Sequence, residues 1–84
     1  MSHWREVRDG EAALLGRELL RELVEGHPLR GRPARAIARR DDCDDVAFDI
    51  EGSGLCVVHL RWAKDSDPQW PSFEFVPDLP GDDL

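Results

Sequence analysis

The chain has 84 residues, of which 40% are apolar, and it carries a net charge of −7. This length suffices for one domain and not for two, and a chain of this size buries only about 60–65% of its unfolded surface, so its core is thin. The apolar content argues against wholesale disorder, and the negative charge argues against nucleic acid or anionic membranes as partners of the whole molecule.

Residues 10–25 are predicted to form an amphipathic helix. Asp9 can act as the N-cap, Gly26 can supply a left-handed C-terminal residue, and Pro28 prevents continuation. Apolar residues recur at three- and four-residue steps and form one stripe, which is expected to cover a sheet. The stripe consists of Ala12, Leu15, Leu19, Leu20, Leu23 and Val24.

Three or four strands are predicted after the helix. Residues 34–40 alternate weakly, which places Arg35 and Arg39 on one face. Residues 46–51 and 55–62 alternate more clearly, and the glycine-containing residues 52–54 between them are typical of a β-hairpin loop. Residues 72–76 could add a short last strand, which Pro77 would end.

These elements predict an α+β fold, with one N-terminal amphipathic helix packed on a three- to four-stranded antiparallel sheet. The single domain is expected to span residues 1–77, followed by an acidic C-terminal tail over residues 78–84. A two-stranded hairpin is marginal alone, so the helix should seal its apolar face. That face is expected to carry Phe48, Ile50, Val58 and Leu60.

Five of the eleven basic residues fall within eleven positions: Arg30, Arg32, Arg35, Arg39 and Arg40. Guanidinium groups suit phosphate and carboxylate because their planar fork donates two parallel hydrogen bonds, so the cluster is a candidate anion-binding or nucleic-acid-binding site. Against nucleic acid, no aromatic residue lies nearby to stack on bases, and residues 41–84 hold twelve acidic residues against two basic ones. The alternatives are internal pairing with the acidic residues that follow and contact with a protein partner.

No metal, cofactor or catalytic site is expected. Asp41, Asp42, Asp44 and Asp45 surround Cys43. These aspartates lack the spacing, central Gly and terminal Glu of a calcium loop, and they are typical of a turn. Cys56 and His59 lie three apart in a predicted strand and should point to opposite faces, which argues against a zinc site and a Cys–His pair. No nucleophile motif or phosphate-binding glycine loop indicates an enzyme.

Two tryptophans frame the polar segment after the hairpin. Trp62 ends a predicted strand, and Trp70 lies in a loop held by two prolines. Aromatic residues on rigid loops are effective anchors of protein interfaces. We therefore expect Trp62 and Trp70, with the acidic Asp65 and Asp67, to contact a partner; the alternative is that Trp70 folds back to close the core.

Several segments resemble a set of small uncharacterised bacterial proteins. The resemblance is carried by HPL at residues 27–29, RAIARR at 35–40, DCDDV at 42–46, VVHLRW at 57–62 and WP at 70–71. In that set the segments read GHPLxGxPxRAIARRxDCDDVLF and then VVHLTWSGKPE and WP, so Arg61 and residues 63–66 depart from the pattern. The resemblance implies a bacterial origin and no known activity, and it groups the arginine stretch, the aspartate turn and the Trp-Pro loop.

The expected compartment is the cytoplasm. The first six residues lack the apolar stretch of a secretion signal, and no apolar run approaches the ~20 residues that cross a bilayer. Two cysteines are too few for a disulfide framework. We expect a non-enzymatic protein–protein interaction module, of the kind found among small regulators, immunity proteins and inhibitors; the alternative is an anion- or nucleic-acid-binding domain that uses the arginine cluster.

Overall fold

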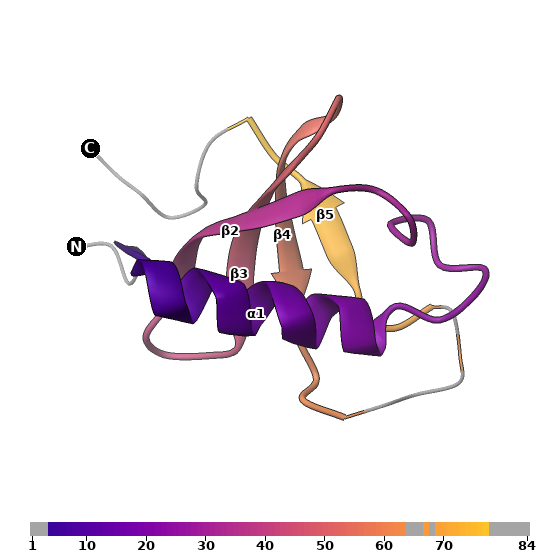
Figure 1. The fold of residues 1–84 in the computed structure, drawn as a ribbon, viewed down its shortest axis with the longest axis horizontal. Helices are drawn as coiled ribbons and strands as arrows, with labels where there is room; N and C mark the ends of the chain where they lie inside the picture. Colours follow the sequence, from indigo (N-terminus) through magenta and orange to yellow (C-terminus); the bar gives the residue numbers. More distant parts are fainter. Residues whose placement is uncertain (1–3, 64–66, 68, 78–84) are drawn as a thin grey trace.

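The structure, a computed structural model, describes residues 4–63, 67 and 69–77. In chain order its elements are β1 (Trp4–Glu6), α1 (Asp9–Glu22), β2 (Ala34–Arg40), β3 (Asp45–Ile50), β4 (Gly54–His59) and β5 (Phe73–Phe75). The strands form one antiparallel sheet in the order of the chain, and α1 lies across one face of it (Figure 1). The α+β fold is confirmed, but the sheet has five strands, not three or four. The expected acidic tail, residues 78–84, lies outside the described residues.

The strand that the sequence did not predict is β1. It pairs with the end of β2, Trp4 opposite Arg40 and Glu6 opposite Ala38. Three residues are too few to show an alternation, so no periodic signal marks this strand. Because β1 pairs with the C-terminal end of β2, α1 begins beside that end of β2.

Helix α1 ends earlier than predicted, at Glu22, and its N-cap is not the predicted residue. Arg8 is the N-cap and makes no hydrogen bond through its side chain, so the prediction of Asp9 as the cap is wrong. Asp9 lies in the first turn, where a negative charge complements the helix dipole. Leu23 leaves the helical conformation, and Arg30 Nη1 donates to its carbonyl oxygen at 2.7 Å. Gly26 has the expected positive φ of 96°, but it lies in the following loop.

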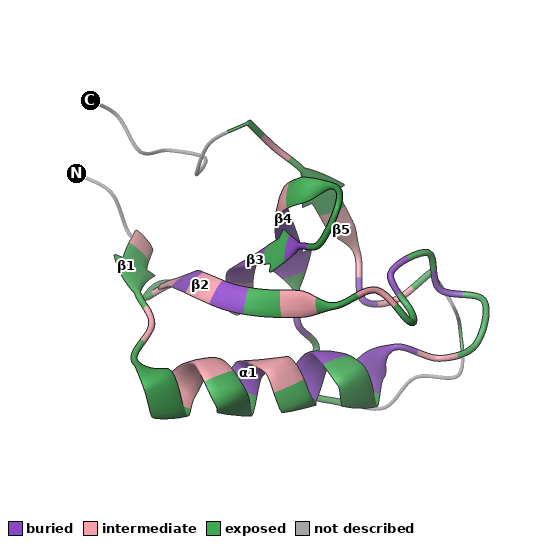
Figure 2. Cartoon of the chain, turned by 45° about the horizontal axis from the view of Figure 1, so that its top comes forward, coloured by how far each residue is buried: buried purple, intermediate pink, exposed green. Residues whose placement is uncertain are grey.

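The core lies between the C-terminal half of α1 and the central strands (Figure 2). Phe48 and Leu60 are buried, as expected, whereas Leu20 is 67% exposed and does not belong to the buried stripe. Two glutamates, Glu18 and Glu22, occupy the buried face of the helix instead. The buried apolar cluster consists of Leu15, Leu19, Leu23, Leu29, Ala36, Val46, Phe48, Ile50, Cys56, Val58 and Leu60.

A β-bulge interrupts the alternation of β2. Ala36 pairs with Phe48, but Ala38 pairs with Ala47, so Ile37 is an extra residue in this strand. Directly opposed residues share a face of the sheet, and the extra residue therefore reverses the faces of everything that follows it. Arg35, opposite Asp49, and Arg39, opposite Val46, lie on opposite faces. The prediction that these two arginines share a face is wrong for this reason.

Candidate functional site

Glu22 connects the last turn of α1 to the segment that follows β4. Its side chain is buried, with an exposed fraction of 2%. Its oxygens accept the backbone N–H groups of Arg61 at 2.8 Å and Trp62 at 2.7 Å, which lie 39 and 40 residues further along the chain. We call these three groups the Glu22 clamp. One side chain thus fixes the path of the chain beyond the sheet.

The clamp holds Trp62 in an unusual conformation. Trp62 has φ 55°, in the left-handed region, which costs a bulky residue about 1–2 kcal/mol. Its side chain is 41% exposed. The sequence predicted that Trp62 would be the last residue of a strand. In the structure β4 ends earlier, at His59, so this prediction is wrong. The structure therefore keeps a large aromatic side chain partly in solvent on a strained backbone.

Glu22 shares its site with a second carboxyl group. Glu18, one turn earlier on α1, is 7% exposed, and its oxygens accept two hydrogen bonds from Arg21, at 2.9 and 2.7 Å. Glu18 also forms a hydrogen bond with Glu22. Two carboxyl groups this close do not ionise independently, because each negative charge disfavours the other.

The different surroundings of Glu18 and Glu22 shift their pKa values in opposite directions. Burial, together with Glu18, raises the pKa of Glu22 to about 7, although the two backbone N–H groups act in the opposite direction. Burial also disfavours ionisation of Glu18, but the Arg21 guanidinium and the hydrogen bond with Glu22 outweigh it and lower the pKa of Glu18. The pair therefore binds one proton below neutral pH, more tightly at Glu22 than at Glu18, and loses it as the pH rises through about 7.

A second set of contacts positions the Trp70 loop beside this segment. The Arg61 guanidinium carbon lies 4.3 Å from the centroid of the Trp70 ring, the geometry of a cation–π contact. Nδ1 of the buried His27 accepts the backbone N–H of Leu29 at 3.0 Å, which leaves Nε2–H to donate to the Pro71 carbonyl oxygen at 2.9 Å. The Trp70–Pro71 peptide bond is cis. The loop is thus attached at both Trp70 and Pro71.

Of the four residues predicted to contact a partner, Trp62 and Trp70 are brought to one region through Arg61. Trp70 is half-buried, in keeping with an edge of the core, whereas Trp62 is the more exposed of the two. Asp67 is exposed and accepts from the backbone N–H and side-chain amide of Gln69 at 3.0 and 2.7 Å, so it shapes its own turn. Asp65 lies outside the described residues.

The predicted arginine cluster does not converge. Arg39 donates to Glu11 at 3.0 Å, and Arg40 donates to Asp42 at 2.8 and 2.6 Å. Arg30 binds the Leu23 carbonyl oxygen, and Arg32 binds the hydroxyl of Ser53. Arg35 lies on the sheet face opposite that of Arg39. Among these arginines, Arg40 pairs with the acidic residues that follow the cluster, Asp42 and Asp45. Arg30, Arg32 and Arg39 bind groups elsewhere in the protein, so the alternative of pairing with the following acidic residues holds for Arg40 alone.

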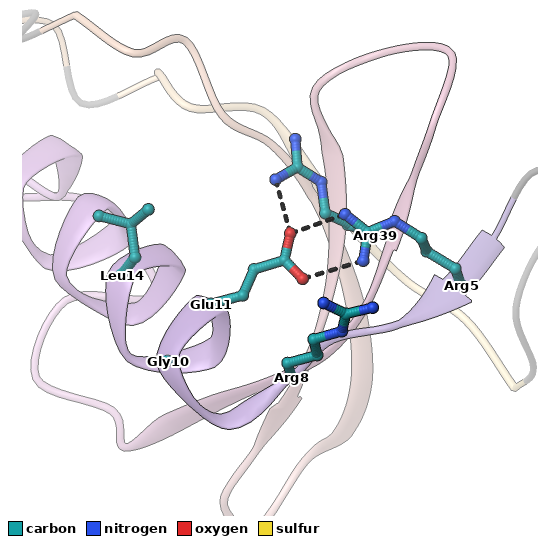
Figure 3. A pocket seen from close by; sticks show the side chains of 6 residues that line it. All are labelled: Arg5, Arg8, Gly10, Glu11, Leu14 and Arg39. Carbon is teal, nitrogen blue, oxygen red and sulfur yellow. Dashed lines mark hydrogen bonds and ion pairs between the residues drawn. The ribbon is translucent and has the colours of Figure 1, made fainter.

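A different group of arginines meets around Glu11, at the beginning of α1 (Figure 3). Arg5 donates to both oxygens of Glu11, at 2.9 and 2.8 Å, and Arg39 adds a third hydrogen bond at 3.0 Å. Together with Arg8 they line a hollow of about 680 Å³. Arg5, and to a lesser degree Arg39, lowers the pKa of Glu11 to about 2. The network joins β1, α1 and β2, and sequence reasoning missed it because β1 was not predicted.

The described residues contain no group of three His, Cys, Asp or Glu side chains placed to hold a metal ion. Cys43 is exposed and Cys56 is buried, and both are free thiols. Burial raises the pKa of Cys56 to about 11, so its thiol stays protonated at neutral pH. His59 contacts Asp45, its register partner across the β3–β4 pair, rather than Cys56. No helix in the described part of the chain has the length and apolarity needed to cross a bilayer.

Comparison of the chain with family models, with curated proteins and with solved structures found no match.

Proposed function

We propose that the protein is a non-enzymatic protein–protein interaction module whose contact surface is centred on Trp62. The observation that carries this proposal is the Glu22 clamp, which holds a half-exposed indole on a left-handed backbone. Strained conformations persist only where the surrounding structure enforces them, and they gather at functional positions. Trp is also among the residues that contribute most to binding energy in protein interfaces.

The neighbours of Trp62 support the same proposal. Arg61, the residue before Trp62, stacks on Trp70, and Asp67 adds an exposed carboxylate in the loop that carries Trp70. Interface centres are enriched in aromatic residues and Arg, and charged residues occupy their rims. We propose a partner that offers an apolar pocket to the indole and polar groups around it. The proposal includes a cytoplasmic setting, in which thiols such as Cys43 and Cys56 stay reduced.

The alternative function, binding of an anion or nucleic acid by Arg30, Arg32, Arg35, Arg39 and Arg40, has less support. Four of these side chains already bind groups within the protein, and they do so at separate places. A shared phosphate would require several guanidinium groups to point to one position.

Affinity capture from the source cells would test the proposal with two matched variants. Trp62→Ala removes the proposed anchor, and Phe75→Ala removes the side chain of β5 that is equally exposed, at 41%. We expect Trp62→Ala to lose a partner that the wild type and Phe75→Ala retain. Circular dichroism should show that both variants are folded. Identical partner profiles for all three proteins, or no partner of the wild type, would refute the proposal.

A further inference from the structure

The group that holds Trp62 in place is a carboxyl that can release a proton. We propose that the proton shared by Glu18 and Glu22 controls the Trp62 surface: while the proton is bound, the clamp is closed, and its loss opens the clamp and frees Trp62. The inference concerns regulation of the proposed interaction surface and rests on the proposed function for its consequence. The opening itself can be measured without any partner.

The positions of Glu18, Glu22 and Arg21 explain why loss of the proton would open the clamp. Glu18 and Glu22 are both buried, and the cation that contacts the pair, Arg21, donates both of its hydrogen bonds to Glu18. If Glu22 also ionises, two negative charges share one buried site and one guanidinium group. A buried charge without a partner is unfavourable, so the side chain moves into solvent or water enters the site.

Among the described residues, no cation pairs with Glu22 alone. On α1 these are Glu18 and Arg21. After β4, the guanidinium group of Arg61 lies over the Trp70 ring. In the loop after α1, Arg30 donates to the Leu23 carbonyl oxygen and His27 donates to the Pro71 carbonyl oxygen. Within the part of the chain that the structure describes, Glu22 accepts the two backbone N–H groups of the clamp and shares the charge of Arg21 with Glu18.

The direction of the switch follows from these contacts. The pKa of Glu22, raised to about 7, places the transition in the physiological range. Above it, the side chain can escape the second negative charge by leaving the pocket, which breaks both hydrogen bonds to residues 61 and 62. Trp62 can then relax from φ 55° to an extended conformation. The strained, exposed pose of the indole therefore belongs to the protonated pair.

The test is amide hydrogen exchange by NMR on the full chain between pH 5 and pH 9, with rates corrected for the intrinsic effect of pH. We expect protection of the Arg61 and Trp62 amides to fall at least tenfold with a midpoint near pH 7. Glu22→Gln should abolish the transition. Glu18→Gln removes the neighbouring charge and should move the midpoint down by about one pH unit or more. Glu25→Gln, at an exposed position beyond the helix, should leave it unchanged.

Protection that stays constant or rises with pH in the wild type would overturn the inference, because it would mean that an ionised Glu22 holds the clamp as well or better. The same transition in Glu22→Gln would also overturn it by assigning the change to another group. If Glu22→Gln does not fold, Glu18→Gln still decides, since the described contacts of Glu18 involve side chains of α1 alone. Failure here leaves the capture experiment with Trp62→Ala unaffected, so the two proposals fail separately.

Discussion

Replacing Glu22 by Gln should destabilise the protein at pH 5 and not at pH 8. Gln keeps the shape of the side chain but has one acceptor oxygen where the clamp uses two, so one of the N–H groups of Arg61 and Trp62 loses its acceptor. A donor left unpaired in a partly buried site costs about 1–3 kcal/mol. At pH 5, where Glu22 is protonated, we therefore expect a loss of about 2 kcal/mol in the free energy of unfolding.

The cost should vanish as the pH rises. Glu22 binds its proton more tightly in the folded protein, with a pKa of about 7, than in the unfolded chain, with its ordinary value of 4.5. Its contribution to stability is therefore complete below about pH 4.5 and is lost as the pH rises through 7. A shift of this size corresponds to about 3 kcal/mol, of the same order as the cost of the substitution. At pH 8 the variant should be as stable as the wild type, or slightly more stable.

Urea unfolding followed by circular dichroism at pH 5, 6, 7 and 8 measures this difference directly. A total stability of about 4–12 kcal/mol is expected for a chain of this length, so a change of 2 kcal/mol is easily resolved. Glu25→Gln is the matched control, because Glu25 is exposed, and it should show no pH-dependent difference from the wild type. A loss of stability in Glu22→Gln that is equal at all four pH values, or that grows with pH, would refute the reasoning.

Three further predictions concern the strain, the network and the core. Trp62→Gly should be more stable than Trp62→Ala by about 0.5–1 kcal/mol in thermal unfolding, the reverse of the usual order, because Gly accepts a φ of 55° without strain; equal stabilities would show that the backbone is not strained. Glu11→Gln should remove part of the acid sensitivity, since the pKa of Glu11 is lowered to about 2 by Arg5 and its contribution to stability is lost as the pH falls below about 4.5; melting curves from pH 2 to 6 that fall in parallel for variant and wild type would contradict this. Phe48→Ala should cost about 3–5 kcal/mol, enough to unfold a large fraction of the protein, since Phe48 is fully buried in the centre of the sheet; a cooperative melt close to that of the wild type would show that the core is placed wrongly.

The parts of the fold that the sequence predicts are those with a local period. The hairpin of β3 and β4 follows from alternation and a glycine loop, and its inner residues Phe48 and Leu60 are buried. β1 could not be predicted, because three residues carry no period. The bulge at Ile37 could not be predicted either, and it alone separates Arg35 from Arg39. A one-residue insertion changes every face that follows, while the composition of the strand stays the same.

The Glu22 clamp shows a different limit. The buried stripe predicted from the sequence consists of apolar residues and leaves out Glu18 and Glu22, which the structure buries. Their spacing held a signal, since residues 15, 18, 19 and 22 lie on one helical face and Leu15 and Leu19 are buried. Two acidic residues inside an apolar face indicate a buried polar contact. The acceptor's partners lie about forty residues away, at Arg61 and Trp62, and no local pattern identifies them.

The most direct measurement of the central claim is a titration of the Glu22 side-chain carboxyl carbon by NMR, together with the amide signal of Trp62. The account predicts that both signals change with a common midpoint near pH 7. A Glu22 carboxyl that titrates near 4.5, with a Trp62 amide that does not follow it, would show that this side chain is solvated and does not hold the segment after β4.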